Sequence, residues 1–291
     1  MIAKPRLGRL TQGSIFCGAF AEDYQRVPVW GIVITARCDT THDKTPIVNY
    51  LPLVRIEDWL ERHGWLLVLD RAYAELRNRF HNLLSQRGLS TSLTEVHDVE
   101  YLAKVHFAER QNATESKKTE KEAKDTAQAR KLAAEMCLLS AALDASIIDP
   151  TLISRGVRVS RKTMQSVVKD LFSHQLSGYY YLPSIGDETE LPSKHGYVAL
   201  LREVHHLPRR TAKMLLDGIG KDDMASGGPL PGVSFDQFDL AYPVAEMQSP
   251  WVEHLMQIFC SLFGRIGVTD LDKARIMSIV NAIAPEKGND Q

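Results

Sequence analysis

Four side chains that can act as nucleophile, base or metal ligand lie close together in the first part of the chain: Cys38, Asp39, His42 and Asp43. A thiol beside an imidazole and a carboxylate is the usual material of nucleophilic catalysis or metal ligation. In enzymes of the Cys/His type, however, the two residues meet through the fold rather than within one loop. The alternative interpretation is structural, with Cys38 packed at the end of a strand and Asp39 forming an Asx-turn.

A second group of candidate residues is basic and surrounds position 160. Arg158, Arg161 and Lys162 precede the apolar face of a predicted helix, and a tyrosine-rich strand containing Tyr180 follows it. Basic residues at the start of a helix that is followed by a strand resemble the recognition helix and wing of a winged-helix protein. In this interpretation Tyr180 stacks on bases. The alternative is an ordinary half-buried strand.

The overall composition limits the classes of function. The 291 residues are 44% hydrophobic and 24% charged, which is typical of a globular chain with one large core or two smaller ones. The formal net charge is −1, so binding to nucleic acid would require a local basic patch. We find no H-E-x-x-H, P-loop or G-x-S-x-G motif, and therefore expect no metal and no cofactor.

Cysteine spacing and hydropathy together predict a cytoplasmic protein. The thiols are scattered, without a C-x-x-C pair, which is typical of a reducing compartment. They are Cys17, Cys38, Cys137 and Cys260. The longest apolar cluster, residues 65–69, is far shorter than the ~18 residues of a membrane span. The N-terminus has no apolar stretch of the kind found in signal peptides. We therefore expect no contact with a membrane.

Residues 1–56 have the pattern of a small β-barrel. Short β-branched and apolar segments at 13–16, 29–35 and 47–54 predict three strands. The second of these is nearly continuous in apolar character, so we expect it to be buried on both faces. Pro52 places the third strand at a sheet edge or ends it there. The fold expected for this region is an SH3-like barrel.

Helical spacing begins after residue 56. Within residues 57–108, apolar residues recur at steps of three and four and predict one long helix that ends near Gly88. Residues 109–150 form a second region, a charged helix or linker whose pattern turns apolar from Leu132.

The remaining region, residues 151–291, is predicted to be mixed α/β. We expect a helix at 160–176, strands at 179–183, 197–204 and 235–240, and a helix that starts at Ser249-Pro250. A final helix is predicted after Thr269. The chain as a whole is therefore assigned to the α+β class.

The N-terminal region also carries a family resemblance. Gly13-Ser14-Ile15, then Arg26-Val27-Pro28-Val29 and residues 31–35, resemble the start of a PemK/MazF-like barrel. The toxic members of that group are metal-independent endoribonucleases. The resemblance implies that Arg26 would stabilise the charge of the phosphorane and that the hydroxyl of Thr35 would contact the phosphate.

A wider resemblance covers both ends of the chain. Gly13-Ser14-Ile15, residues 34–39, residues 181–183 and residues 249–255, followed by Arg265-Ile266-Gly267, are similar to a set of bacterial proteins. Those proteins share a Gly-Asp-Ile start, a Cys-Asp pair after the second strand and a C-terminal Ser-Pro helix. No activity accompanies this resemblance. It implies a bacterial intracellular protein, with phage defence or a mobile element as possible settings.

Two hypotheses for the function follow. The first is a non-enzymatic binding or adaptor component of a bacterial system, with a protein partner expected and nucleic acid as a second possibility. The second is a metal-independent ribonuclease that uses Arg26 and Thr35, with residues 38–42 lining its site.

Overall fold

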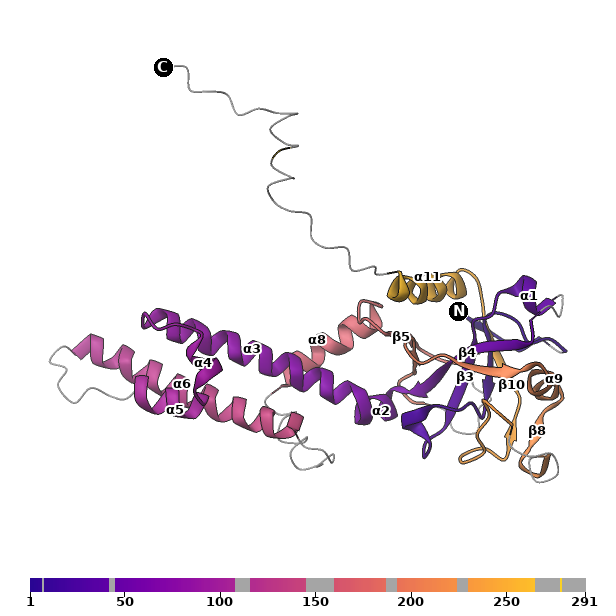
Figure 1. Cartoon of the computed structure of the whole chain (residues 1–291), viewed down its shortest axis with the longest axis horizontal. Coiled ribbons are helices and arrows are strands. Elements are labelled where there is room, and N and C mark those ends of the chain that lie inside the picture. The colour runs from indigo at the N-terminus through magenta and orange to yellow at the C-terminus, as the bar shows by residue number, and fades with distance from the viewer. Residues whose placement is uncertain are drawn as a thin grey trace, which may run out of the picture.

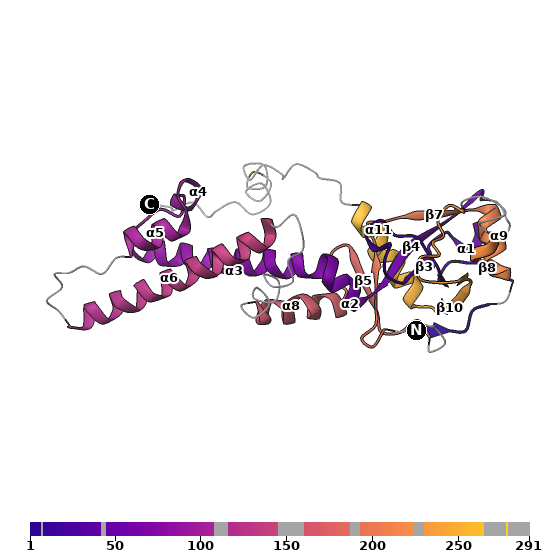
Figure 2. The ribbon, with the colours of Figure 1, turned by 90° about the horizontal axis from the view of Figure 1, so that it is seen from below.

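The computed structural model shows an elongated molecule with a curled β-sheet at one end and a helical arm at the other (Figures 1 and 2). The residues that the structure describes are 1–6, 8–41, 45–107, 116–144, 160–186, 193–223, 230–264 and 278. Helices and strands are both prominent, and the sheet is an antiparallel half-barrel, so the predicted α+β class is confirmed. No helix in the described ranges has both the length and the apolar character needed to span a lipid bilayer.

The main sheet joins strands from both ends of the chain. Its order is β1-β10-β2-β3-β4-β6-β5, and β7 pairs with one half of β4. The strands are β1 (Ile2–Ala3), β2 (Ser14–Cys17), β3 (Val29–Val33), β4 (Ile47–Arg55), β5 (Tyr179–Leu182), β6 (Tyr197–Leu200), β7 (His205–Pro208) and β10 (Pro243–Met247). A two-stranded sheet pairs β8 (Ile219–Gly220) with β9 (Leu240–Ala241). The N-terminal meander β2-β3-β4 is thus flanked on both sides by C-terminal strands.

Strand β3 is buried on both faces, as its continuous apolar sequence predicted. Side chains alternate across a strand, so Val29 and Val33 enter one core cluster while Trp30 and Ile32 enter the other. The first cluster is covered by α2 (Ile56–Trp59), α8 (Arg161–Phe172) and α9 (Arg209–Asp217). The second is covered by α11 (Trp251–Phe263). The sheet therefore forms the middle layer between helices.

Pro52 lies inside the sheet, so the prediction that it marks an edge is wrong. It is opposite Gly31 in the β3–β4 ladder. Residues 201–204, which link β6 to β7, lie on its other side. The amide of Ile34 donates to the carbonyl of Asn49 (2.9 Å). Because backbone hydrogen bonds alternate between the two sides of an antiparallel strand, every second residue from Asn49 bonds to β3, and Pro52 is not one of them. The missing N–H of Pro52 therefore faces the interruption between β6 and β7, where no ladder bond is lost.

The helical arm is built on α3, the long helix that the spacing of apolar residues predicted. The π-helical turn η2 (Leu60–Gly64) leads into α3 (Trp65–Gln86), and α4 (Leu93–Val96), α5 (Val99–His106) and α6 (Ser116–Asp144) follow. Gly88 has a φ of 70°, and the amides of Gly88 and Leu89 donate to the carbonyls of Ser85 and Leu84. This is a Schellman cap, so the predicted helix end at Gly88 is confirmed.

The charged region predicted as a helix or linker forms most of α6. Exposed Lys124 and Glu120 make an i, i+4 ion pair of 2.8 Å on its solvent face. On the opposite face, burial against α3 and α5 starts at Thr126 and Ala129, before the predicted docking point at Leu132. Figures 1 and 2 both show α6 running alongside α3, so the arm is a helical bundle with its own core.

The C-terminal region differs from its prediction in three places. The expected strand at 235–240 is irregular except for Leu240, which belongs to β9, because Phe235 and Phe238 insert into two different core clusters. The expected strand at 197–204 is split, with β6 ending at Leu200 and β7 beginning at His205. Helix α9 was not predicted at all. The helix predicted after Thr269 lies outside the described residues.

Candidate functional site

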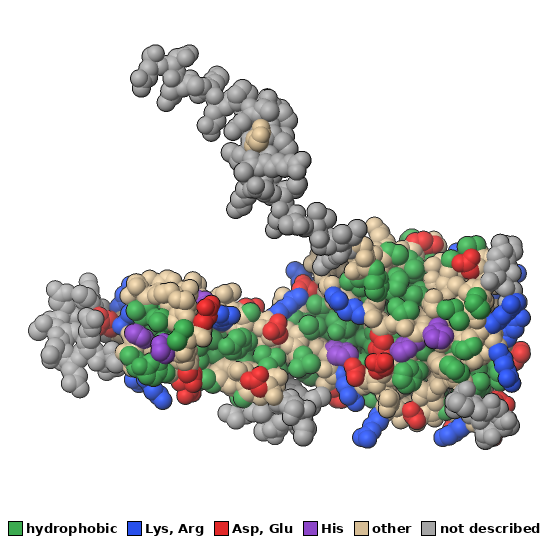
Figure 3. Space-filling view, viewed as in Figure 1, with side chains coloured by type: hydrophobic (Ala, Val, Ile, Leu, Met, Phe, Trp, Pro, Cys, Tyr) green, Lys and Arg blue, Asp and Glu red, His purple; other side chains and the backbone are tan. Residues whose placement is uncertain are grey.

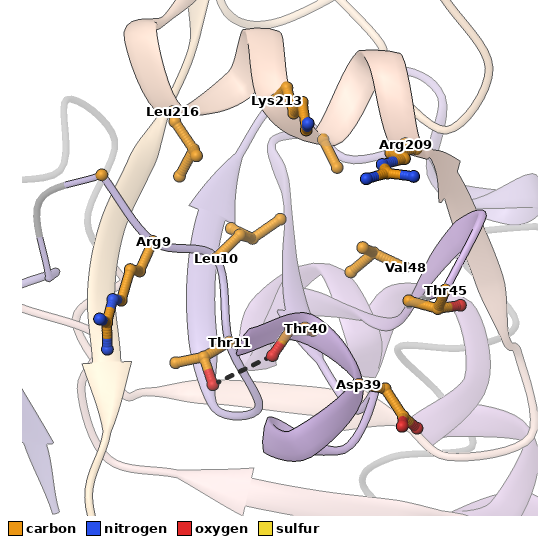
Figure 4. A pocket seen from close by; sticks show the side chains of 12 residues that line it. Arg9, Leu10, Thr11, Asp39, Thr40, Thr45, Val48, Arg209, Lys213 and Leu216 are labelled. Carbon is orange, nitrogen blue, oxygen red and sulfur yellow. Dashed lines mark hydrogen bonds between the residues drawn. The ribbon is translucent and has the colours of Figure 1, made fainter. Parts of the chain in front are cut away.

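A pocket of about 290 Å³ lies between α9 and the short helix α1 (Arg37–Thr41), as shown in Figure 4. Its lining comes from the segment before β2, from α1, from the start of β4 and from α9. The lining residues are Gly8, Arg9, Leu10, Thr11, Asp39, Thr40, Thr45, Val48, Arg209, Ala212, Lys213 and Leu216. Segments far apart in the sequence thus meet at one site.

One face of α9 forms a wall of this pocket. Arg209, Ala212, Lys213 and Leu216 are spaced at i, i+3, i+4 and i+7, which places them on one side of an α-helix. The helix is anchored at its start, where the amide of Arg209 donates to the carbonyl of Pro46 (2.9 Å). The two apolar members extend the core cluster, and the two basic members also line the pocket, as Figure 4 shows.

Basic side chains and hydroxyls dominate the polar part of the lining. Arg9, Arg209 and Lys213 are cations, and Asp39 is the carboxylate among the lining residues. Thr11, Thr40 and Thr45 also line the cavity; the hydroxyls of the first two lie 3.5 Å apart, as the dashed line in Figure 4 marks, and that of Thr45 donates to the carbonyl of Ile47 (2.7 Å). Guanidinium and ammonium groups around one cavity make a site suited to an anion.

The Cys38–Asp39–His42 group is only partly assembled. Its segment is helical rather than a loop, and Asp39 lines the pocket while Cys38 is exposed and outside the lining. The Sγ of Cys38 lies 3.6 Å from Oδ1 of Asp39. The Asp39 amide donates to the carbonyl of Ala36, as in a helical turn, so the expected Asx-turn is replaced by α1. His42 lies outside the described residues.

Arg26 and Thr35 are not brought together. Arg26 is exposed in the turn before β3, and Thr35 follows the other end of the same strand. A strand of five residues spans roughly 15 Å or more, which is too far for both side chains to contact one phosphate. The hydroxyl of Thr35 accepts a hydrogen bond from the amide of Asn49 (2.6 Å), which holds the end of β3 against β4.

Tyr180 is completely buried, so its predicted role in stacking on bases requires correction. Its ring stacks on His174 with centroids 4.1 Å apart, and its hydroxyl lies 3.1 Å from Nδ1 of His254. Burial raises the pKa of Tyr180 to about 12. Arg161 and Lys162 are exposed in the first turn of α8. Arg158 lies outside the described residues.

The His174 environment predicts a measurable dependence of stability on pH. Burial and the neighbouring His254 lower the pKa of His174 from its usual value of about 6.5. As the pH falls, the imidazole of His174 is therefore protonated in the unfolded chain before it is protonated in the folded one. The free energy of unfolding is highest above pH ~6.5 and decreases as the pH drops from there through the lowered pKa. We expect His174→Asn to lessen the fall in Tm between about pH 7.5 and 5.5.

Asparagine is chosen for this variant because His174 has a φ of 56°, a conformation that asparagine tolerates. Thermal melts followed by circular dichroism across this pH range provide the measurement. An identical pH dependence in the wild type and the variant would contradict the assignment.

The residues that sequence reasoning missed are Arg9, Arg209 and Lys213. Arg209 and Lys213 are separated by one helical turn, and that spacing within residues 209–217 was the available signal. No group of three or more His, Cys, Asp or Glu side chains in the described ranges is placed to hold a metal ion.

Comparison with protein-family models, with curated proteins and with solved structures returned no significant match. The resemblances described above therefore rest on the quoted residues alone, and the functional argument rests on the pocket.

Proposed function

We propose that this protein is a non-enzymatic binding or adaptor component of a bacterial intracellular system, and that the pocket between α1 and α9 holds an anionic group of its partner. The observation that supports this most is that Arg9, Arg209 and Lys213 all line one cavity. Because guanidinium and ammonium groups form strong charge-assisted hydrogen bonds with phosphate and carboxylate, such a cavity favours an anion.

A binding role fits the lining better than a catalytic one. Acid–base and nucleophilic catalysis at neutral pH mostly use histidine or cysteine. The lining of the pocket contains neither among the residues that the structure describes. Its basic side chains can hold an anion without changing their protonation state.

The ribonuclease hypothesis has weaker support. It requires Arg26 and Thr35 at one phosphate, and these residues flank opposite ends of β3. The SH3-like barrel remains our proposal for the sheet: the meander β2-β3-β4 and the curl of the sheet support it, with closure supplied by C-terminal strands (Figure 1). Barrels of this size serve as binding scaffolds as readily as enzymes.

The test is a calorimetric titration of the full chain with inorganic pyrophosphate and with citrate as probes. We expect binding of at least one anion, weakened at least tenfold by Arg209→Ala or Lys213→Ala alone and about a hundredfold or more when the two are combined, since each charged hydrogen bond contributes roughly 1.5–3 kcal/mol. Arg210→Ala is the matched control, because Arg210 is the neighbour of Arg209 on α9 but does not line the pocket. Equal affinities in all variants, or no binding, would refute the pocket as an anion site.

A further inference from the structure

A second cavity continues the pocket along α9. It has a volume of about 300 Å³ and shares Gly8 and Leu216 with the first cavity. Its other walls include Arg6, Asp217 and Tyr242. Because two lining residues belong to both cavities, the two lie next to each other along the helix, and we call the pair the α9 groove.

The α9 groove is long enough for more than one anionic group. Arg209, at the start of α9, lines the first cavity, and Asp217, at its end, lines the second. The helix has nine residues and therefore runs about 13 Å along the groove. Over that length a nucleic acid strand presents several phosphates, whereas a single small anion fills one cavity.

Positive charge is concentrated in the first cavity of the groove, because the second is also lined by Asp217 and the cation that lines it, Arg6, is paired with Glu246. Arg9, Arg209 and Lys213 lie in the first cavity and Arg6 in the second. Nε of Arg6 is held by buried Glu246 at 2.9 Å, yet its side chain is 56% exposed and a guanidinium has further donors for a ligand. Figure 3 shows Lys and Arg side chains gathered at the end of the molecule where α1 and α9 lie. This is the local basic patch that a chain of net charge −1 needs.

Apolar surface lies between the cations. Leu216 lies where the two cavities join, and Leu240 and Tyr242 line the second one. The side chain of Leu240 is 46% exposed, so the groove offers uncovered apolar area next to its charges. A groove that alternates basic groups with aromatic and apolar surface is the arrangement used for single strands, in which phosphates meet cations and bases stack on side chains.

We propose that the α9 groove binds a single strand of nucleic acid, with phosphates at Arg9, Arg209 and Lys213 and bases over Leu216 and Tyr242. This inference rests on the proposed function and names its ligand. A single strand presents both phosphates and unstacked bases to such a surface, whereas a duplex keeps its bases stacked inside. An acidic peptide is the competing ligand that the experiment includes.

The experiment is fluorescence anisotropy with a labelled oligo-uridine of about 12 nucleotides, a length that exceeds the groove. With three phosphate contacts, the affinity of the wild type is expected to fall about 20-fold between about 50 and 200 mM salt, and that of the Arg209→Ala/Lys213→Ala variant only about threefold. Arg210→Ala should keep most of the salt dependence of the wild type. Tyr242→Leu should weaken binding without changing the slope, because it removes a stacking surface but no charge.

Each variant is first checked by its Tm, so that loss of folding is not read as loss of binding. Pyrophosphate binding without oligonucleotide binding would overturn this inference and leave the proposed function standing. Absence of both would overturn both. A poly-glutamate of equal length that binds more tightly than the oligonucleotide would overturn the inference in favour of an acidic protein partner.

Discussion

Replacing Gly31 by alanine is expected to lower the free energy of unfolding by about 3 kcal/mol, the upper part of the range for overpacked cores. A Cβ at this position would lie 2.4 Å from Cζ of Phe16 and 2.9 Å from Cδ2 of Tyr50. Both rings are fully buried and pack edge to face, 5.1 Å apart, across β3. Neither ring can move without opening a neighbouring contact, since cores are close-packed.

The hydroxyl of Tyr50 makes this substitution still more costly. It donates to the carbonyl of Gly232 (2.8 Å) and accepts from the amide of Phe20 (3.2 Å), so a shifted ring also breaks contacts to two loops. Urea denaturation followed by tryptophan fluorescence measures the change. Gly220→Ala is the matched control: Gly220 is also a strand residue, but a Cβ there meets its nearest atom at 3.5 Å, so its stability should be nearly unchanged. A Gly31→Ala variant as stable as the control would contradict the packing around β3.

Phe80→Ala is expected to unfold the helical arm while leaving the sheet intact. Phe80 is fully buried on α3 and faces Phe107, with ring centroids 6.1 Å apart. Truncating a buried phenylalanine costs about 3–5 kcal/mol. The cluster around it belongs to α3, α5 and α6 and shares no buried residue with the two clusters of the sheet. The loss should therefore fall mainly on the arm.

Hydrogen exchange resolved by peptide is the measurement for this variant, because it reports local opening. We expect faster exchange in α5 and α6 and unchanged protection in β2, β3 and β4. Leu66→Ala is the control, since Leu66 lies on the same helix with 49% of its surface exposed. Uniformly faster exchange in the arm and the sheet would show that the two cores unfold together.

Local features were the ones that the sequence predicted well. The face of α3 and the cap at Gly88 depend on residues within a few turns of one another, and the burial of β3 follows from its own composition. The strand at Tyr179–Leu182 was also predicted, but not which tyrosine points inward. Period-two alternation leaves that choice to the strand's neighbours, and they bury Tyr180.

The candidate site was beyond sequence reasoning because its parts are distant in the chain. Asp39 was identified as a candidate, but the basic side chains opposite it come from α9 and from Arg9. Helix α9 directly follows β7, with no turn signal between His205–Pro208 and its first residue. Its amphipathic character is visible only once the start of the helix is known. Pro52 was misplaced for a related reason, since the interruption that accommodates it is formed by residues 201–204.

The pairing of N-terminal with C-terminal strands has a consequence for biosynthesis. Tyr50 and Gly232 contact each other across a separation of 182 residues. At ~5–20 residues per second, a ribosome adds Gly232 about 10–40 s after Tyr50. The arm is contiguous in sequence and can fold during that interval, whereas β3 and β4 emerge without the partners that cover their apolar faces. The nascent chain therefore presents an unpaired strand edge, the kind of segment on which chaperones act, until translation is nearly complete.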